Sequence, residues 1–115
     1  MANEIVNQFE TVKSVFERED VKLKFESMLG KKANGFIVSV INAVQNSDML
    51  QKADRNSILF SAAVAASLDL PINENLGFAY IVPYNKKQKD GSYLTVAQFQ
   101  LGYKGFLQLA LYFEF

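Results

Sequence analysis

Lysines toward the C-terminal end carry the clearest potential for chemistry in this chain. Lys86, Lys87 and Lys89 lie together in the segment NKKQKDGS, and Lys104 follows further on. Tyrosines are interleaved with these lysines: Tyr80, Tyr84, Tyr93 and Tyr103. Ammonium groups neutralise phosphates and aromatic rings stack on bases, and together they bind single-stranded nucleic acid with little regard to its sequence. The pattern therefore predicts a nucleic-acid-binding surface.

Gln98 and Gln100 alternate along the segment that leads to Lys104. Their side-chain amides can donate hydrogen bonds to phosphate oxygens without selecting a base. A structural interpretation competes with this one, because lysines in a polar loop are usually solvated and tyrosines in strands usually pack against neighbours. The two glutamines would then simply face water. The residues alone leave both interpretations open.

The chain offers few residues that could catalyse a reaction or bind a metal. The chain contains no cysteine and no histidine, which removes disulfides, thiolate nucleophiles, imidazole bases and the usual zinc ligands. The segment Gly30-Lys31-Lys32 lacks the earlier glycine and the hydroxyl of a phosphate-binding loop, so no ATP site is expected. We therefore expect a protein that is not an enzyme and that uses no cofactor and no metal.

Overall charge and length limit the number of domains and the kinds of partner that the chain can have. The 12 basic and 12 acidic residues cancel, but residues 1–77 hold 8 basic and 10 acidic groups (−2) and residues 78–115 hold 4 and 2 (+2). A chain of 115 residues is expected to form one domain. The N-terminus has neither a basic start nor a long apolar run, so no signal peptide or membrane span is expected and the expected location is cytoplasmic.

The first part of the chain has the three- and four-residue apolar spacing of amphipathic helices. The first stripe consists of Ile5, Val6, Phe9, Val12, Val15 and Phe16. Asp20 and Asp54 are expected to cap a second and a fourth helix, and Asn34 to start a third. The expected breaks are Gly30, Asn46-Ser47-Asp48 and Pro71. The fourth helix carries small residues that let another backbone approach closely: Ser61, Ala62, Ala65 and Ala66.

After Pro71 the apolar period changes to two, which predicts a β-hairpin over about Phe78 to Tyr103. Asp90-Gly91 is the expected tight turn, and Pro83 indicates an edge strand or a bulge because it cannot donate to a ladder. Two faces of the return strand follow from the alternation: Ala97, Phe99, Leu101 and Tyr103 on one, and Val96, Gln98, Gln100 and Lys104 on the other.

A last helix is expected from about Gly105, after a tight passage between Gly102 and Gly105. Its sequence FLQLALYFEF is apolar on every side, which requires burial and predicts self-association of the chain. The fold class expected is α+β, with helices over residues 1–70 and a hairpin and helix over residues 78–115.

Three motifs in fixed order resemble the RecT family of phage-type single-strand DNA annealing proteins. These motifs are LDLP, then LGFAYIVPY, then QFQLGYKGFLQLA, within a similarity that runs from about Phe25 to Leu111. The resemblance implies ATP-independent annealing of single-stranded DNA in homologous DNA recombination, without a cofactor. It further implies a homo-oligomer of bacterial or phage origin that works beside a phage-type exonuclease. Under this function the pattern of lysines, glutamines and tyrosines predicts the DNA-binding residues Lys86, Lys87, Lys89, Gln98, Gln100, Tyr103 and Lys104.

The chain departs from the family pattern after Leu111. Longer family members usually continue with an arginine and a Ser/Thr-Gly pair, whereas here Tyr112-Phe-Glu-Phe follows. We therefore expect residues 1–115 to be a single truncated RecT-like domain, a fragment of the RecT-type annealing fold, in which annealing is impaired. The alternative function is a protein-interaction or oligomerisation fragment that does not bind DNA and associates with full-length partners through its helices.

Overall fold

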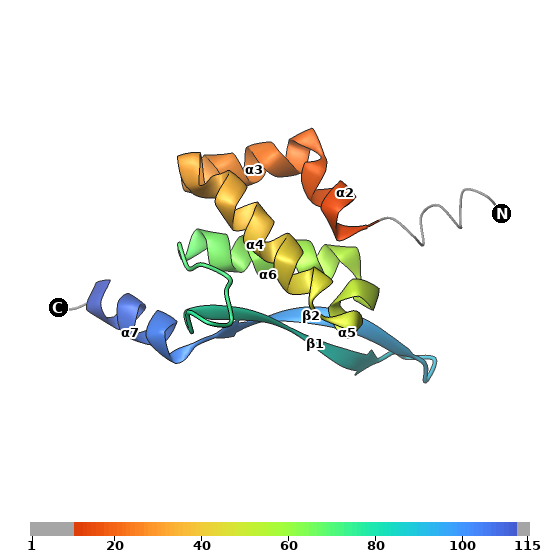
Figure 1. Ribbon diagram of the computed structural model, residues 1–115. Helices are drawn as coiled ribbons and strands as arrows, with labels where there is room; N and C mark the ends of the chain where they lie inside the picture. The colour runs from red at the N-terminus through yellow and green to blue at the C-terminus, as the bar shows by residue number, and fades with distance from the viewer. Residues whose placement is uncertain (1–10, 113–115) are drawn as a thin grey trace.

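The computed structural model describes residues 11–112, in which helices precede a β-hairpin and a final helix. The first helices are α2 (Val12–Glu17), α3 (Glu19–Leu29), the 3-10 turn η1 (Gly30–Lys32), α4 (Ala33–Gln45), α5 (Asp48–Lys52) and α6 (Arg55–Ser67). The hairpin consists of β1 (Ala79–Lys87) and β2 (Tyr93–Leu101), and α7 (Tyr103–Tyr112) follows it. In Figure 1 the helices form a layer on one face of the hairpin, and α7 extends beyond its end. The α+β prediction is confirmed.

A chain of three phenylalanine rings holds the first helices together. The ring centroids of Phe16 and Phe25 are 5.7 Å apart, and those of Phe25 and Phe36 are also 5.7 Å apart. These residues come from α2, α3 and α4, and all three are buried. Of the predicted first stripe, Val12, Val15 and Phe16 are buried, while Ile5, Val6 and Phe9 lie outside the described residues.

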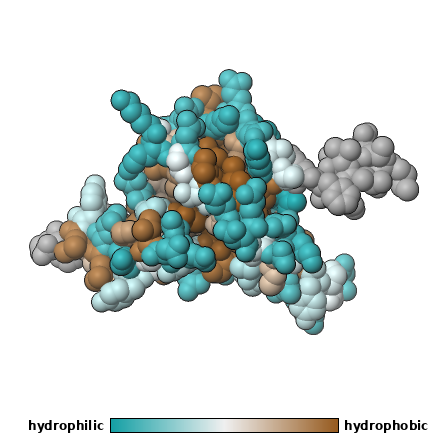
Figure 2. Space-filling view, viewed as in Figure 1, coloured by the Kyte–Doolittle hydropathy of each residue, from teal (hydrophilic) through white to brown (hydrophobic). Residues whose placement is uncertain are grey.

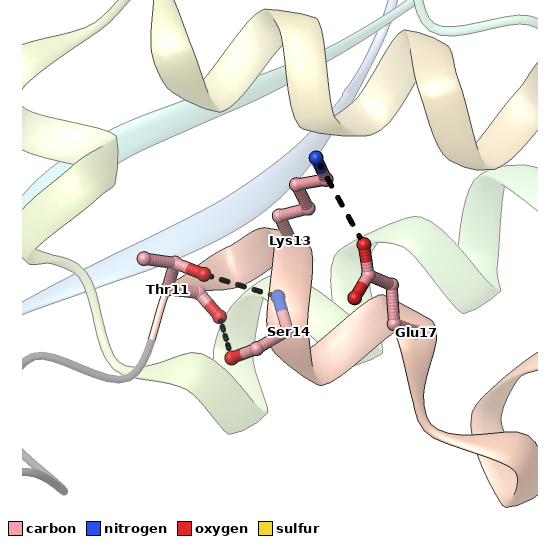
Figure 3. Close-up of polar contacts among 4 residues, drawn as sticks. All are labelled: Thr11, Lys13, Ser14 and Glu17. Carbon is pink, nitrogen blue, oxygen red and sulfur yellow. Dashed lines mark hydrogen bonds and ion pairs between the residues drawn. The ribbon is translucent and has the colours of Figure 1, made fainter.

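Side-chain caps start most of these helices. The Thr11 hydroxyl accepts from the Ser14 N–H at 3.1 Å, and the Ser14 hydroxyl donates back to the Thr11 carbonyl (Figure 3). The Lys13–Glu17 ion pair in Figure 3 is 4.0 Å long and solvent-exposed, so it adds little stability. Asp54 caps α6 by accepting from the Ser57 N–H at 3.1 Å, as the sequence predicted.

Asp20 does not cap α3, and that prediction was wrong. The helix begins at Glu19, and Asp20 lies in its first turn. Its carboxylate instead accepts two hydrogen bonds from the Arg18 guanidinium, at 3.2 and 3.0 Å. These bonds hold the pKa of Asp20 below its ordinary value. At the predicted break over residues 46–48 a further short helix begins, which the sequence did not predict. This helix is α5, and Ser47 caps it by accepting a hydrogen bond from the Leu50 N–H.

The end of α6 was predicted at Pro71, but the helix stops at Ser67. Asp69 adopts a left-handed conformation (φ 55°), its N–H donates to the Ala66 carbonyl, and the Leu70 N–H donates to the Ala65 carbonyl. This is a Schellman cap, which satisfies the last carbonyls before any proline is reached. The Lys32 ammonium holds the Asp69 carboxylate at 2.6 Å, so η1 and the end of α6 are tied together.

The small residues of α6 are buried as predicted: Ser61, Ala62, Ala65 and Ala66. They let α6 pack closely inside the helical layer and against the hairpin. The buried Ser61 hydroxyl is satisfied by the Ser57 carbonyl at 2.8 Å. No helix within residues 11–112 is long and apolar enough to cross a membrane.

The hairpin has an unbroken antiparallel register from Ala79 opposite Leu101 to Lys87 opposite Tyr93. Its turn closes with a 3.1 Å hydrogen bond from the Gly91 N–H to the Gln88 carbonyl, and Gly91 has a φ of 90° that favours glycine. Alternate residues face the helices: Ala79, Ile81 and Ala97 belong to the core. The predicted strands and turn are therefore confirmed.

Two hydrogen bonds from α6 fix which backbone groups of the hairpin point outward. The Asp54 N–H donates to the Thr95 carbonyl, and the Ala97 N–H donates to the Ser57 hydroxyl, both at 2.8 Å. Thr95 and Ala97 therefore turn their backbone groups away from β1. Pro83 lies opposite Ala97, in a pair that exchanges no ladder bond, so its missing N–H would face the outer edge of β1. Pro83 thus marks an edge strand, and the unbroken register shows no bulge.

The last helix begins at Tyr103, earlier than predicted, so Tyr103 and Lys104 lie in its first turn and not in a connecting passage. Gly102 and Gly105 are required by close packing, because a Cβ on Gly102 would collide with the Gly77 carbonyl and one on Gly105 with the Phe78 carbonyl. Most of α7 is exposed, with Phe106 57%, Leu111 71% and Tyr112 81% accessible. Apolar surface is visible on this projecting end of the molecule in Figure 2.

Candidate nucleic-acid interface

The loop lysines lie at the tip of the hairpin. Lys86 and Lys87 are the last residues of β1, and Lys89 lies in the turn. All three are exposed. Asp90 lies beside them and accepts from both the hydroxyl (2.6 Å) and the N–H (2.9 Å) of Ser92, which lowers its pKa. The tip therefore carries three ammonium groups and one carboxylate that stays ionised.

Gln98 and Gln100 lie on the face of the hairpin that the helices leave uncovered, which we call the open face. The register places Gln98 opposite Val82 and Gln100 opposite Tyr80. Both glutamines are exposed, and Tyr84 is 42% exposed on the same face. Lys86 alternates in step with Tyr80 and Tyr84, so it lies at the tip end of the open face. Lys87 belongs to the opposite face of β1, where it is exposed at the edge of the tip. The predicted grouping of Val96, Gln98 and Gln100 on one face is consistent with this register.

Tyr103 and Lys104 lie at the opposite end of the hairpin, in the first turn of α7. The Lys104 N–H donates to the Gly77 carbonyl at 3.1 Å, and the Lys104 side-chain stem runs past Gly77 near the Tyr80 hydroxyl. Tyr103 is 75% exposed. Lys104 is therefore held more firmly along its stem than the lysines of the tip, although its charge reaches solvent.

The structure does not gather the predicted site residues into one pocket. Each nine-residue strand extends over about 26 Å at about 3.3 Å per residue, and the tip lysines and Lys104 lie beyond its two ends. Gln98 and Gln100 lie between these two basic ends. The result is an elongated face, with positive charge at both ends and amide groups between them, that matches the extended form of a single strand of several nucleotides.

Two tyrosines belong to this face although the predicted site omitted them. Tyr80 pairs with Gln100 and Tyr84 pairs with Val96 across the two strands. Their alternation with the core residues Ala79 and Ile81 would have placed them on the open face from the sequence. Among residues 11–112 there is no cluster of acidic residues that could hold a metal ion.

The fold and the open face define a class: a small α+β unit that offers an uncovered β-hairpin with basic ends. A sequence model of the RecT family matches residues 34–113. YqaK of Bacillus subtilis (strain 168), an uncharacterized protein, is 47% identical over 107 residues, which make up 93% of this chain and 34% of YqaK. The chain belongs to the RecT family.

Family membership confirms the resemblance seen in the three motifs. The match covers residues 34–113, which include all of α4 but its first residue, α5, α6, the hairpin and α7. The chain spans about a third of the length of YqaK (34%), so the activity of a full-length family member is not carried over with the match.

Proposed function

We propose that the chain binds single-stranded DNA along the open face of the hairpin and contributes to ATP-independent strand annealing in homologous recombination. The observation that supports this most is the placement of Gln98 and Gln100 between the basic tip and Lys104. In this proposal Lys86, Lys87, Lys89 and Lys104 neutralise phosphates, and the two glutamines donate to phosphate oxygens.

The proposed binding mode suits annealing because it contacts the backbone and the faces of the bases, which leaves the Watson–Crick edges of the bases free to pair. The open face presents side chains from a two-stranded sheet, and in Figure 1 the helical layer lies on the other face. Tyr80, Tyr84 and Tyr103 stack on individual bases without choosing among them. A strand whose charge is neutralised pairs with its complement without bond breaking or ATP. In longer family members the single strand would come from a phage-type exonuclease partner.

A titration of fluorescein-labelled oligothymidylate, followed by anisotropy, tests this proposal. Affinity is expected to fall steeply with salt and to exceed the affinity for duplex of the same length. Lys86→Ala combined with Lys87→Ala should lower the slope of log affinity against log salt by about 1.4, from about 0.7 per phosphate contact on a single strand. The matched control is Lys22→Ala with Lys24→Ala on α3, which lies in the helical layer. Equal effects of the two double variants would contradict the open face as the site.

The alternative function, a protein-interaction fragment, is favoured by one observation: the exposed apolar side chains of α7. If that helix mediates homo-oligomerisation, Phe106→Lys with Leu111→Lys should shift the chain toward monomer in sedimentation velocity. Leu23→Lys, at a residue of α3 that is also exposed, is the control. A fragment that assembles through α7 but does not bind oligothymidylate would favour this alternative over DNA binding.

A further inference from the structure

The edge of β1 that faces away from β2 borders a groove of about 470 Å³. Ala79–Pro83 form one wall of this groove. The other wall comes from the second half of α4, from Ser47 and Leu50, and from the segment Ile72–Asn75 after α6. Because five consecutive residues of β1 line it, the groove runs along the edge of the strand and not over one face. Figure 2 shows apolar surface enclosed by polar side chains between the helical layer and the hairpin.

Backbone groups of Ile81 point into this groove. Four hydrogen bonds show which backbone groups of the hairpin point inward and which point outward. Two of them cross the hairpin, from Gln88 to Ser92 and from Gly102 to Phe78. The other two join the odd-numbered residues Thr95 and Ala97 to α6, on the outer side of β2. Odd-numbered residues of β1 therefore direct their N–H and C=O groups to the free edge. Ile81 is only 7% exposed, and nothing within residues 11–112 bonds to its outward N–H or C=O.

The same edge already carries the beginning of a third strand. Ile72 forms a parallel bridge with Ala79, after which the chain turns away at Asn73, where Leu76 donates to the Asn73 carbonyl at 2.9 Å. The edge is thus occupied at Ala79 and open at Ile81. Pro83 offers only a carbonyl there, so the open stretch is short.

We propose that this groove binds an extended, uncharged peptide segment of a partner protein, which adds to the free edge of β1 as a strand. The complement of an N–H and a C=O on one residue is another peptide backbone, and strand addition is a recurrent mode of peptide recognition. Side chains of the bound segment alternate between the apolar inner wall, formed by Ala43, Leu50 and Ile72, and the outer residues Tyr80 and Val82.

The charge of the groove argues for a peptide over a nucleic acid. Its described lining contains no lysine or arginine, and Glu74 is its one charged residue. A phosphate backbone in this groove would meet a carboxylate and no cation. A folded second copy is also a poor occupant, because α4 and α5 flank the edge and a copy would bring its own α4 and α5 to the same place.

An acetylated and amidated peptide with the sequence of β2, YLTVAQFQL, is the probe, because it is uncharged and forms an extended strand in the hairpin. Amide exchange is measured by NMR on the 115-residue chain. Peptide at ten times its Kd should slow exchange of the Ile81 N–H about elevenfold. The Val82 N–H, which faces β2, should keep its protection.

Groove-filling variants give the matched comparison. Asn42→Trp places an indole in the groove from α4 and should abolish peptide binding, while Gln45→Trp, on the same helix but away from the groove, should leave it intact. Both positions are exposed, so both variants should fold, as circular dichroism will verify. Unchanged oligothymidylate binding by Asn42→Trp separates this site from the open face.

Several results would overturn the proposal. These are failure of the peptide to slow Ile81 exchange, equal binding by the two tryptophan variants, loss of Val82 protection through displacement of β2, and protection of Ile81 by oligothymidylate. Ile81 protection that rises with protein concentration in the absence of peptide would equally overturn it, because the edge would then pair with a second copy.

Discussion

The helical layer and the hairpin with α7 differ in how their apolar residues are used. In the helical layer the large side chains converge on Phe16, Phe25 and Phe36, which are all buried. In the C-terminal part, α7 leaves Phe106, Leu111 and Tyr112 exposed, and only alternate hairpin residues reach the core. The buried ring cluster therefore makes the helical layer the main contributor to stability, whereas the C-terminal part leaves most of the apolar surface of α7 exposed.

The largest effect that tests this comparison is expected from Phe25→Ala. Phe25 is 1% exposed and contacts two other rings, so its loss should lower the free energy of unfolding by about 3–5 kcal/mol. Phe60→Ala, at a residue of α6 that is 72% exposed, is the control and should change it little. Urea denaturation measures both. Similar losses for the two variants would mean that the ring cluster is not where stability is concentrated.

A smaller effect is expected where α7 meets the hairpin. Gly105→Ala places a methyl group against the Phe78 carbonyl, so we expect a loss of about 1–3 kcal/mol from overpacking. Gly35→Ala in α4 meets no atom within 4 Å and should stabilise the helix, by about 0.5–1 kcal/mol. Thermal unfolding of both variants measures the difference. A neutral Gly105→Ala would show that α7 shifts freely against the hairpin.

The third prediction compares the two basic ends of the open face. Lys104 has its stem along Gly77 and lies in the first turn of α7, whereas Lys89 lies in the exposed turn. A lysine that is already ordered loses less side-chain entropy on meeting a phosphate. Lys104→Ala should therefore weaken oligothymidylate binding more than Lys89→Ala, each lowering the salt slope by about 0.7 or less. The reverse order in the anisotropy titration would place the main contact at the tip.

The smallest effect concerns the pH dependence of the tip. Hydrogen bonds from Ser92 lower the pKa of Asp90 below 3.8 in the folded chain. A carboxyl group with a lowered pKa contributes its stabilisation above its unfolded pKa and loses it as the pH falls through the folded value. The Ser92 amide resonance should therefore stay constant down to about pH 4 and move below it. Asp90→Asn should remove that acid transition, and a transition that persists would assign it to another group.

Local chemistry made part of the fold predictable from the sequence. The period-two alternation and Asp90-Gly91 located the hairpin, and Asp54 was recognised as a cap because carboxylates accept from the first N–H groups of a helix. The end of α6 was missed because a left-handed Asp69 leaves no sequence signal as strong as that of proline. The five-residue α5 is too short to show a period.

The candidate site was harder to predict because its geometry depends on contacts between distant segments. The sequence grouped the loop lysines with Lys104, but the length of the strands separates them. The groove at Ile81 could not be predicted at all. The groove needs a wall from α4 and α5 beside the edge of β1, and the sequence does not show that these helices lie there. The helical layer is held against the hairpin by bonds between distant residues, such as that between Ser57 and Ala97, which are 40 residues apart.

Those two bonds from α6 also limit how copies of this chain can assemble. Because the start of α6 occupies the outer side of β2 at Thr95 and Ala97, a new strand that joins the described sheet over this stretch can do so only at β1. Contacts that repeat head to tail require two different complementary surfaces on each subunit, and a sheet with one free side provides only one. Over this stretch of residues 11–112, continuous β-sheet cannot therefore link successive copies of the chain, and any repeating assembly would need other contacts.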